Sequence, residues 1–249
     1  MSLFSVMGLT SVIAIALLIV ILFVSRLAFY RSFPALLIYY VFILGFLLQL
    51  LGYVHIGKNF MHELGVLNNF LDTPLMLLFL TYFSKTVYSR KRMMILITGF
   101  VAFELLMIVI FGFNSQATTI ILAPGLLLVL GISIMVFIHQ VKIAVVYHRA
   151  IGKAVMAASM LLTYVGYAFV YTVFYVIKPV YRDDAHLVYF LITAFTCSIM
   201  AVGVYIERKR VNQLNELKIT REELKAIYGG NPNNKIANPL EPAILKFDK

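Results

Sequence analysis

The sequence predicts an all-α integral membrane protein, a bundle of seven transmembrane helices, and three observations lead to this fold class. Of the 249 residues, 62% are hydrophobic, and the mean hydropathy is +0.93. Only 13% are charged, whereas about a quarter is typical of a soluble domain. Seven segments reach the roughly 20 apolar residues that one membrane crossing needs. One soluble core is too small to bury this excess, so we expect the apolar residues to face lipid.

The seven segments are separated by short polar or basic links. Segments of this length can only be helices, because the strands of a membrane barrel have about ten residues and backbone groups in lipid must pair internally. The first segment lacks a basic leader and a small-residue cleavage site, so we interpret it as a membrane helix and not as a cleaved signal. The segments cover residues 3–25, 34–56, 62–83, 93–113, 117–139, 153–177 and 186–206. We expect Pro74 and Pro124 to kink the third and fifth helices.

Lysine and arginine alternate between rich and poor links, and this alternation predicts the orientation. The links after the first, third, fifth and seventh helices hold Arg26 and Arg31; Lys85, Arg90, Lys91 and Arg92; Lys142, Arg149 and Lys153; and Arg208, Lys209 and Arg210. The opposite links hold only Lys58, and Lys178 with Arg182 beside two aspartates. Because cytoplasmic loops are rich in Lys and Arg, we expect the N-terminus outside, the C-terminus in the cytoplasm, and a multi-pass protein of the cell membrane.

The composition changes after the seventh helix, which suggests three parts. Residues 1–206 form the seven-helix transmembrane domain, residues 207–228 a cytoplasmic amphipathic helical extension, and residues 229–249 a disordered tail rich in Asn and Pro. Within the extension, Thr220 and Glu223 have the spacing of a capping box that starts a short helix, and Gly229 is a stop signal.

The net charge of +10 does not indicate nucleic-acid binding, because basic loops account for it and no soluble domain remains to carry that function. The single cysteine, Cys197, excludes an intramolecular disulfide. It lies in an apolar run, where a buried thiol is expected.

Two acids lie near the middle of predicted spans, Asp72 in the third helix and Glu104 in the fourth. Ionisable groups at membrane depth are costly, so each is a functional candidate. No Lys, Arg or His occupies the middle of any span, so neither acid has an obvious cationic partner. The alternative is a neutral acid that hydrogen-bonds to a neighbouring helix for packing.

Asp72 shares one helix face with other polar or small residues, because Gly65, Asn68, Asn69 and Met76 recur around it at helical spacing. We expect this face to meet polar faces of the second, sixth and seventh helices in an aromatic-lined cavity. Ordinary aromatic packing remains the alternative for the tyrosine stripe of the sixth helix, which continues to Tyr175. The predicted ligand-binding residues are Gln49, Asn68, Asn69, Asp72, Glu104, Tyr164, Tyr167, Tyr171, Thr193, Thr196 and Cys197.

The stretch "NNFLDTPLMLLFL", residues 68–80, resembles the third helix of microbial (type I) rhodopsins. That helix carries an acid, a Trp, then Thr-Thr-Pro-Leu and a leucine run, and Thr73, Pro74, Leu75, Leu77 and Leu78 match it. Seven helices, an outside N-terminus and a length of about 250 residues are also similar to that family. The resemblance implies an opsin-like scaffold.

The chain departs from the rhodopsin pattern at the positions that serve the chromophore. Asn68 stands at the family's primary carboxylate, Asn69 at its Trp, Phe79 at its inner carboxylate, and Gly65 where an Arg is usual. The seventh span has no lysine for a retinal Schiff base, and Cys197 or a neighbour stands there. The chain also lacks tryptophan. We therefore expect no covalent retinal and predict no cofactor.

These patterns favour a sensor or receptor-like protein that binds a small apolar or lipid-like ligand in the bundle, and we favour a non-enzymatic role. A proton or small-solute transporter using Asp72 and Glu104 is one alternative. A zinc lipid hydrolase using His55, His62 and His186 is another, although "HELGV" is not HExxH. An accessory subunit of a membrane complex is the third. The expected partners are the lipid bilayer, the ligand, and a second copy or a complex partner.

Overall fold

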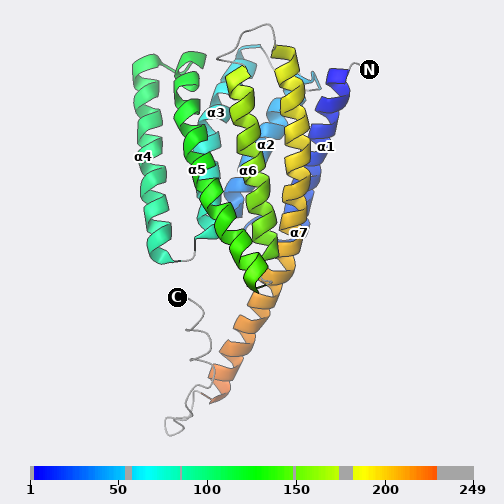
Figure 1. Cartoon of the computed structure of the whole chain (residues 1–249), viewed down its shortest axis with the longest axis vertical. Helices are drawn as coiled ribbons and strands as arrows, with labels where there is room; N and C mark the ends of the chain where they lie inside the picture. Colours follow the sequence, from blue (N-terminus) through cyan, green and yellow to red (C-terminus); the bar gives the residue numbers. More distant parts are fainter. Residues whose placement is uncertain (1–2, 54–57, 85, 148–149, 174–181, 229–249) are drawn as a thin grey trace. The chain divides into compact units, whose positions relative to one another are not determined.

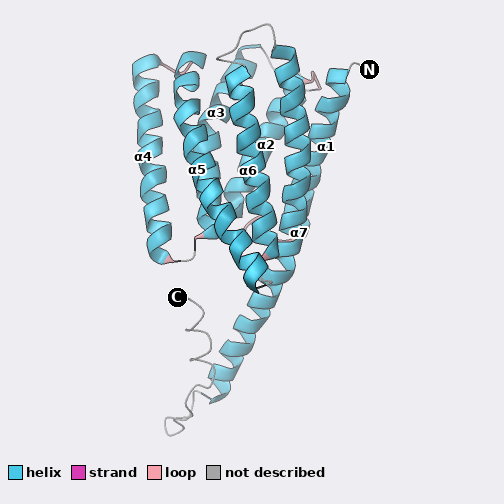
Figure 2. Ribbon diagram, in the orientation of Figure 1, coloured by secondary structure: helices cyan, strands magenta, loops and turns pink. Residues whose placement is uncertain are grey.

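The computed structural model describes residues 3–53, 58–84, 86–147, 150–173 and 182–228, and the regular structure in this part of the chain is helical, without a strand (Figure 2). The all-α prediction is therefore confirmed for these residues. The helices are α1 (Leu3–Val24), α2 (Phe33–Leu50), α3 (Lys58–Leu80), the 3-10 turn η1 (Thr81–Phe83), α4 (Val87–Phe111), α5 (Ser115–Tyr147), α6 (Ile151–Thr172) and α7 (Arg182–Tyr228). Each predicted span overlaps one α-helix, and seven helices of the described part are long and apolar enough to cross a membrane.

Several helices extend beyond the apolar segments that predicted them. α4 begins at Val87 and α5 continues to Tyr147, so both include basic residues that the sequence assigned to links. Hydropathy marks only the apolar length, whereas Lys and Arg are good helix formers that continue the hydrogen-bonded spiral. α2 is shorter than expected and ends at Leu50, just before Gly52 adopts a positive φ of 77°.

The predicted helix start at Thr220 is wrong. α7 continues without a break from Arg182 to Tyr228, and the Thr220 hydroxyl donates a 3.0 Å hydrogen bond to the carbonyl of Glu216. A threonine inside a helix can bond to the carbonyl four residues before it instead of capping a new helix.

The chain divides into two compact units, Met1–Arg208 and Lys209–Lys249. The limit predicted from the sequence is residue 206. The predicted disordered tail, residues 229–249, lies outside the described residues. Within the second unit, the described helix has exposed apolar residues such as Leu214, Leu217 and Leu224.

Within the first unit, consecutive helices contact one another from α1 through α6 (Figure 1). Ser159 on α6 donates a 2.7 Å hydrogen bond to the carbonyl of Thr196 on α7. Ser11 on α1 donates one of 2.7 Å to the carbonyl of Phe190 on α7. Because α7 bonds to both α6 and α1, the helices of this unit form a closed ring. α3 contacts α2, α4 and α5, whereas α4 lies at the edge of the bundle in Figure 1.

Both prolines lie inside their helices, next to the place where α3 and α5 meet. A Cβ added to Gly125 would clash with Oγ1 of Thr73 and would lie 3.1 Å from the ring of Phe100 on α4. Thr73 and Gly125, each next to one of the prolines, therefore lie at the contact between the two helices.

Candidate functional site

Asp72 lies inside the helix bundle, where two other helices supply its polar neighbours. It is 7% exposed, and the Tyr164 hydroxyl on α6 donates a 2.8 Å hydrogen bond to its Oδ1. Tyr39 on α2 is a second polar neighbour of the same carboxyl group. The expectation that Asp72 faces inward holds, and the carboxyl group joins α2, α3 and α6.

Aromatic rings surround this acid and form a tyrosine cluster, defined here as Tyr39, Tyr40, Tyr164, Tyr167 and Tyr189. Tyr164 and Tyr167 meet edge to face with their ring centroids 5.9 Å apart. Tyr167 stacks on Tyr189 of α7 at 5.5 Å, and Tyr39 packs against Tyr40 at 5.1 Å. The cluster therefore draws on α2, α6 and α7 and encloses the acid of α3.

Cys197 on α7 belongs to the same centre, because its thiol is buried and Tyr40 is its polar neighbour. Burial of this thiol was expected, and its tyrosine partner was not. Of the predicted ligand-binding residues, the structure thus brings together Asp72, Tyr164, Tyr167 and Cys197.

Glu104 on α4 is the second acid buried in the bundle. It is 5% exposed, and its Oε1 has no hydrogen-bond partner within the described part of the chain. Asp72 is its electrostatic neighbour. On the α3, α4 and α5 side, Val66, Phe70, Phe100, Ala117 and Ile121 form an apolar cluster. Glu104 is therefore a buried acid with one carboxyl oxygen that accepts no hydrogen bond from the described residues.

The other predicted residues take separate positions. The Tyr171 hydroxyl turns toward α5 and donates a 3.3 Å bond to the carbonyl of Thr119. The Thr196 hydroxyl bonds within α7, to the carbonyl of Ile192 at 2.8 Å. Thr193 is buried, and its hydroxyl has no partner among the residues described. Gln49 is buried on α2, whereas Asn68 and Asn69 are half-buried on α3. Tyr175 lies outside the described residues.

Sequence reasoning missed three members of the tyrosine cluster: Tyr39, Tyr40 and Tyr189. Each lies within an otherwise apolar stretch, "LLIYYVF" on α2 and "HLVYFLI" on α7. A tyrosine hydroxyl in an apolar span needs a partner, so these positions carried the same signal as the stripe on α6. Neither α2 nor α7 repeats its tyrosines at the three- or four-residue spacing seen on α6, so the sequence shows no stripe there.

The histidines proposed as zinc ligands do not form a described site. Within the described residues, no group of three or more His, Cys, Asp or Glu side chains could hold a metal ion. His186 packs edge to face with Phe4 at 6.3 Å, and it stacks with Phe190 at 6.5 Å. His55 and the side chain of His62 lie outside the described part.

A third buried acid, Glu207, lies at the end of the first unit, although the sequence-based division assigns it to the extension. It is fully buried, and the Tyr82 hydroxyl of η1 donates a hydrogen bond to its Oε1. The Lys153 ammonium lies 4.5 Å from the centre of the Tyr82 ring. These contacts connect η1, α6 and α7 at the end of the bundle where α4 begins.

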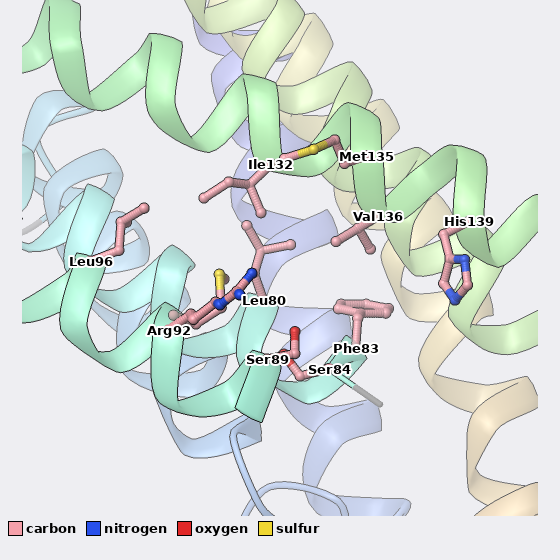
Figure 3. Close-up of a pocket in the computed structure, with 11 residues that line it drawn as sticks. Leu80, Phe83, Ser84, Ser89, Arg92, Leu96, Ile132, Met135, Val136 and His139 are labelled. Carbon is pink, nitrogen blue, oxygen red and sulfur yellow. The ribbon is translucent and has the colours of Figure 1, made fainter. Parts of the chain in front are cut away.

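An open groove of about 450 Å³ lies beside this end, lined by α4, α5, η1 and the last residue of α3 (Figure 3). Apolar side chains such as Leu96, Ile132 and Met135 form most of its wall, and Arg92 on α4 and His139 on α5 also line it. None of the predicted ligand-binding residues lines this groove.

No protein-family model matches this chain, and comparison with curated proteins and with solved structures finds no significant relative. The comparisons therefore add no support to the resemblance to microbial rhodopsins.

Proposed function

We propose that this chain is a sensor of the receptor type, which spans the cell membrane and binds a small apolar or lipid-like ligand around Asp72. The observation that carries the proposal is the buried Tyr164–Asp72 hydrogen bond inside the tyrosine cluster. An acid at membrane depth is costly and is a functional candidate by default. Ligand sites combine mostly apolar and aromatic walls with a few placed polar groups, and this centre has that composition.

The same hydrogen bond supports a route from ligand binding to a response. A ligand that competes for the Asp72 carboxyl group would weaken the connection between α3 and α6 and shift the population of bundle conformations. In the proposed topology, the N-terminus is outside, so the basic links and the extension of α7 face the cytoplasm. The output would therefore leave through those segments.

Ligand-dependent stabilisation of the purified full-length protein tests this function. The thermal unfolding temperature is measured in detergent with oleic acid, dodecanol and non-covalent retinal as probes, in the wild type, Asp72→Ala and Tyr164→Phe. We expect at least one probe to raise the wild-type temperature and to lose most of this effect in both variants. Tyr205→Phe is the matched control, because Tyr205 is 66% exposed on α7. Temperatures that no probe changes, or an equal rise in Asp72→Ala, would contradict the proposal.

Proton or small-solute movement is the second candidate, and the Oε1 of Glu104, which lies near Asp72 and has no hydrogen-bond partner among the residues described, favours it. Two interior acids without a basic residue in mid-span have the chemistry of a proton relay. Flux into liposomes that contain the protein distinguishes this function. A flux that persists in Asp72→Asn and in Glu104→Gln would remove both acids from the mechanism.

A further inference from the structure

The groove beside α4 has two chemically different ends. Its wall is mostly apolar, and the exposed side chain of Met135 and that of Leu96 stand at its open side. Ser84, Ser89, Arg92 and His139 supply the polar groups, and none of the lining residues is acidic. An apolar wall with a basic, hydroxyl-bearing end is complementary to an amphiphile with an anionic head.

Arg92 is held in position by its own helix. Its Nη2 donates a 2.7 Å hydrogen bond to the Tyr88 hydroxyl, and its guanidinium lies 4.1 Å from the centre of the Tyr88 ring. Arg92 makes no ion pair with an acid of the described residues. Figure 3 shows it extending from α4 into the groove. A positioned arginine that keeps further donors is suited to bind a phosphate.

The start of α4 adds to the positive potential at this end. α4 begins at Val87, and the Ser89 amide donates a 3.1 Å hydrogen bond to Oγ1 of the capping residue Thr86. The N-terminal end of a helix carries a partial positive charge. An anion at the groove would therefore be attracted both by the Arg92 guanidinium and by the positive end of α4.

We propose that this groove binds an anionic phospholipid, with the phosphate at Arg92 and an acyl chain against Leu96, Ile132 and Met135. The volume of about 450 Å³ lies within the roughly 300–1,000 Å³ of ligand pockets. α3 and α4 end and begin here, so in the proposed membrane location the groove opens at the level of the headgroups. Anionic lipids of the cytoplasmic leaflet attract basic groups at this level. The site is separate from the ligand site proposed at Asp72, and its test does not depend on that ligand.

Lipid retention by the full-length protein tests this site. The protein is exchanged into mixtures of phosphatidylglycerol and phosphatidylcholine, and bound lipid is counted by native mass spectrometry. We expect the wild type to retain phosphatidylglycerol preferentially and Arg92→Gln to lose about tenfold to a hundredfold in affinity, because a hydrogen bond to a charged group is removed. Arg90→Gln is the matched control, since it removes the same charge from the same helix and Arg90 does not line the groove.

The apolar wall is tested separately with Ile132→Trp, which fills the groove and leaves Arg92 in place. We expect this variant to lose phosphatidylglycerol, whereas Ile138→Trp, at an exposed position outside the groove, retains it. Inorganic phosphate alone should not raise the unfolding temperature, because it lacks the acyl chain. Equal losses in Arg92→Gln and Arg90→Gln, or equal retention of the two lipids by the wild type, would overturn the proposal. If the wild type is a dimer and Ile132→Trp makes it a monomer, the groove binds a second copy of the chain instead of a lipid.

Discussion

The Tyr164 hydroxyl on α6 donates a 2.8 Å hydrogen bond to Oδ1 of Asp72 on α3, across 92 positions of sequence. Both side chains are buried, and Tyr39 on α2 contacts the same carboxyl group. The only aspartate in the middle of an apolar span therefore connects three helices. Its contribution to stability and its proposed role in ligand binding can be separated by substitution.

Removing the Tyr164 hydroxyl should weaken the bundle by a measurable but modest amount. Interhelical hydrogen bonds in membrane proteins contribute about 0.6 kcal/mol on average and up to about 1.7, so Tyr164→Phe should lower the free energy of unfolding by about 1 kcal/mol. Unfolding in mixed micelles measures it. In a double-mutant cycle, the variant that carries both Tyr164→Phe and Asp72→Ala should lose less stability than the sum of the losses in the two single variants. Strict additivity would mean that the bond contributes nothing.

Replacing Glu104 by leucine should stabilise the protein. Its Oε1 is buried and lacks a hydrogen-bond partner in the described part of the chain, and an unsatisfied buried group costs about 1–3 kcal/mol. We expect Glu104→Leu to raise the free energy of unfolding by about 1 kcal/mol, whereas Glu104→Gln, which keeps a polar group there, should not. If Glu104→Leu destabilises instead, the acid has a structural partner. A stabilised variant that loses flux would identify Glu104 as functional.

The contact between α6 and α7 depends on two glycines. A Cβ at Gly152 would lie 2.7 Å from the backbone nitrogen of Glu207 and 2.9 Å from the carbonyl oxygen of Gly203. Backbone atoms cannot rotate away, so Gly152→Ala should cost about 1–3 kcal/mol, as overpacking does. Gly99→Ala on α4 is the control, because nothing lies within 4 Å of its Cβ position. This control should gain about 0.5–1 kcal/mol from helix propensity. Equal effects in the two variants would show that α6 and α7 separate without cost.

The Tyr82–Glu207 hydrogen bond should also contribute to stability. Tyr82→Phe removes the hydroxyl that donates to the buried acid and keeps the ring against which Lys153 lies. We expect the free energy of unfolding to fall by about 1–3 kcal/mol. Glu223→Gln, an exposed acid on the same helix as Glu207, serves as the control and should change little. Thermal unfolding of both variants measures the difference, and an unchanged Tyr82→Phe would count against the contact.

Part of the candidate site was accessible from the sequence. Asp72, Glu104 and Cys197 were expected to be buried, and each is, because a polar side chain within an apolar span has a strong reason to avoid lipid. Tyr164 and Tyr167 were expected near Asp72 from their spacing on one helix face. The hydroxyl of Tyr171 shares that face and still reaches α5, because the face is broad and different turns of α6 meet different helices.

The apolar composition of the chain was sufficient to determine the seven helices, since a backbone in lipid must satisfy its hydrogen bonds within each segment. It did not determine how far each helix continues into its basic ends, nor that Glu207 is buried. The tertiary structure alone decided which tyrosines surround Asp72 and where α4 and α5 leave a groove. Those features depend on the rotation and crossing of each helix, and contacts such as Gly152 with Gly203 and Gly125 with Thr73 set them between residues far apart in sequence.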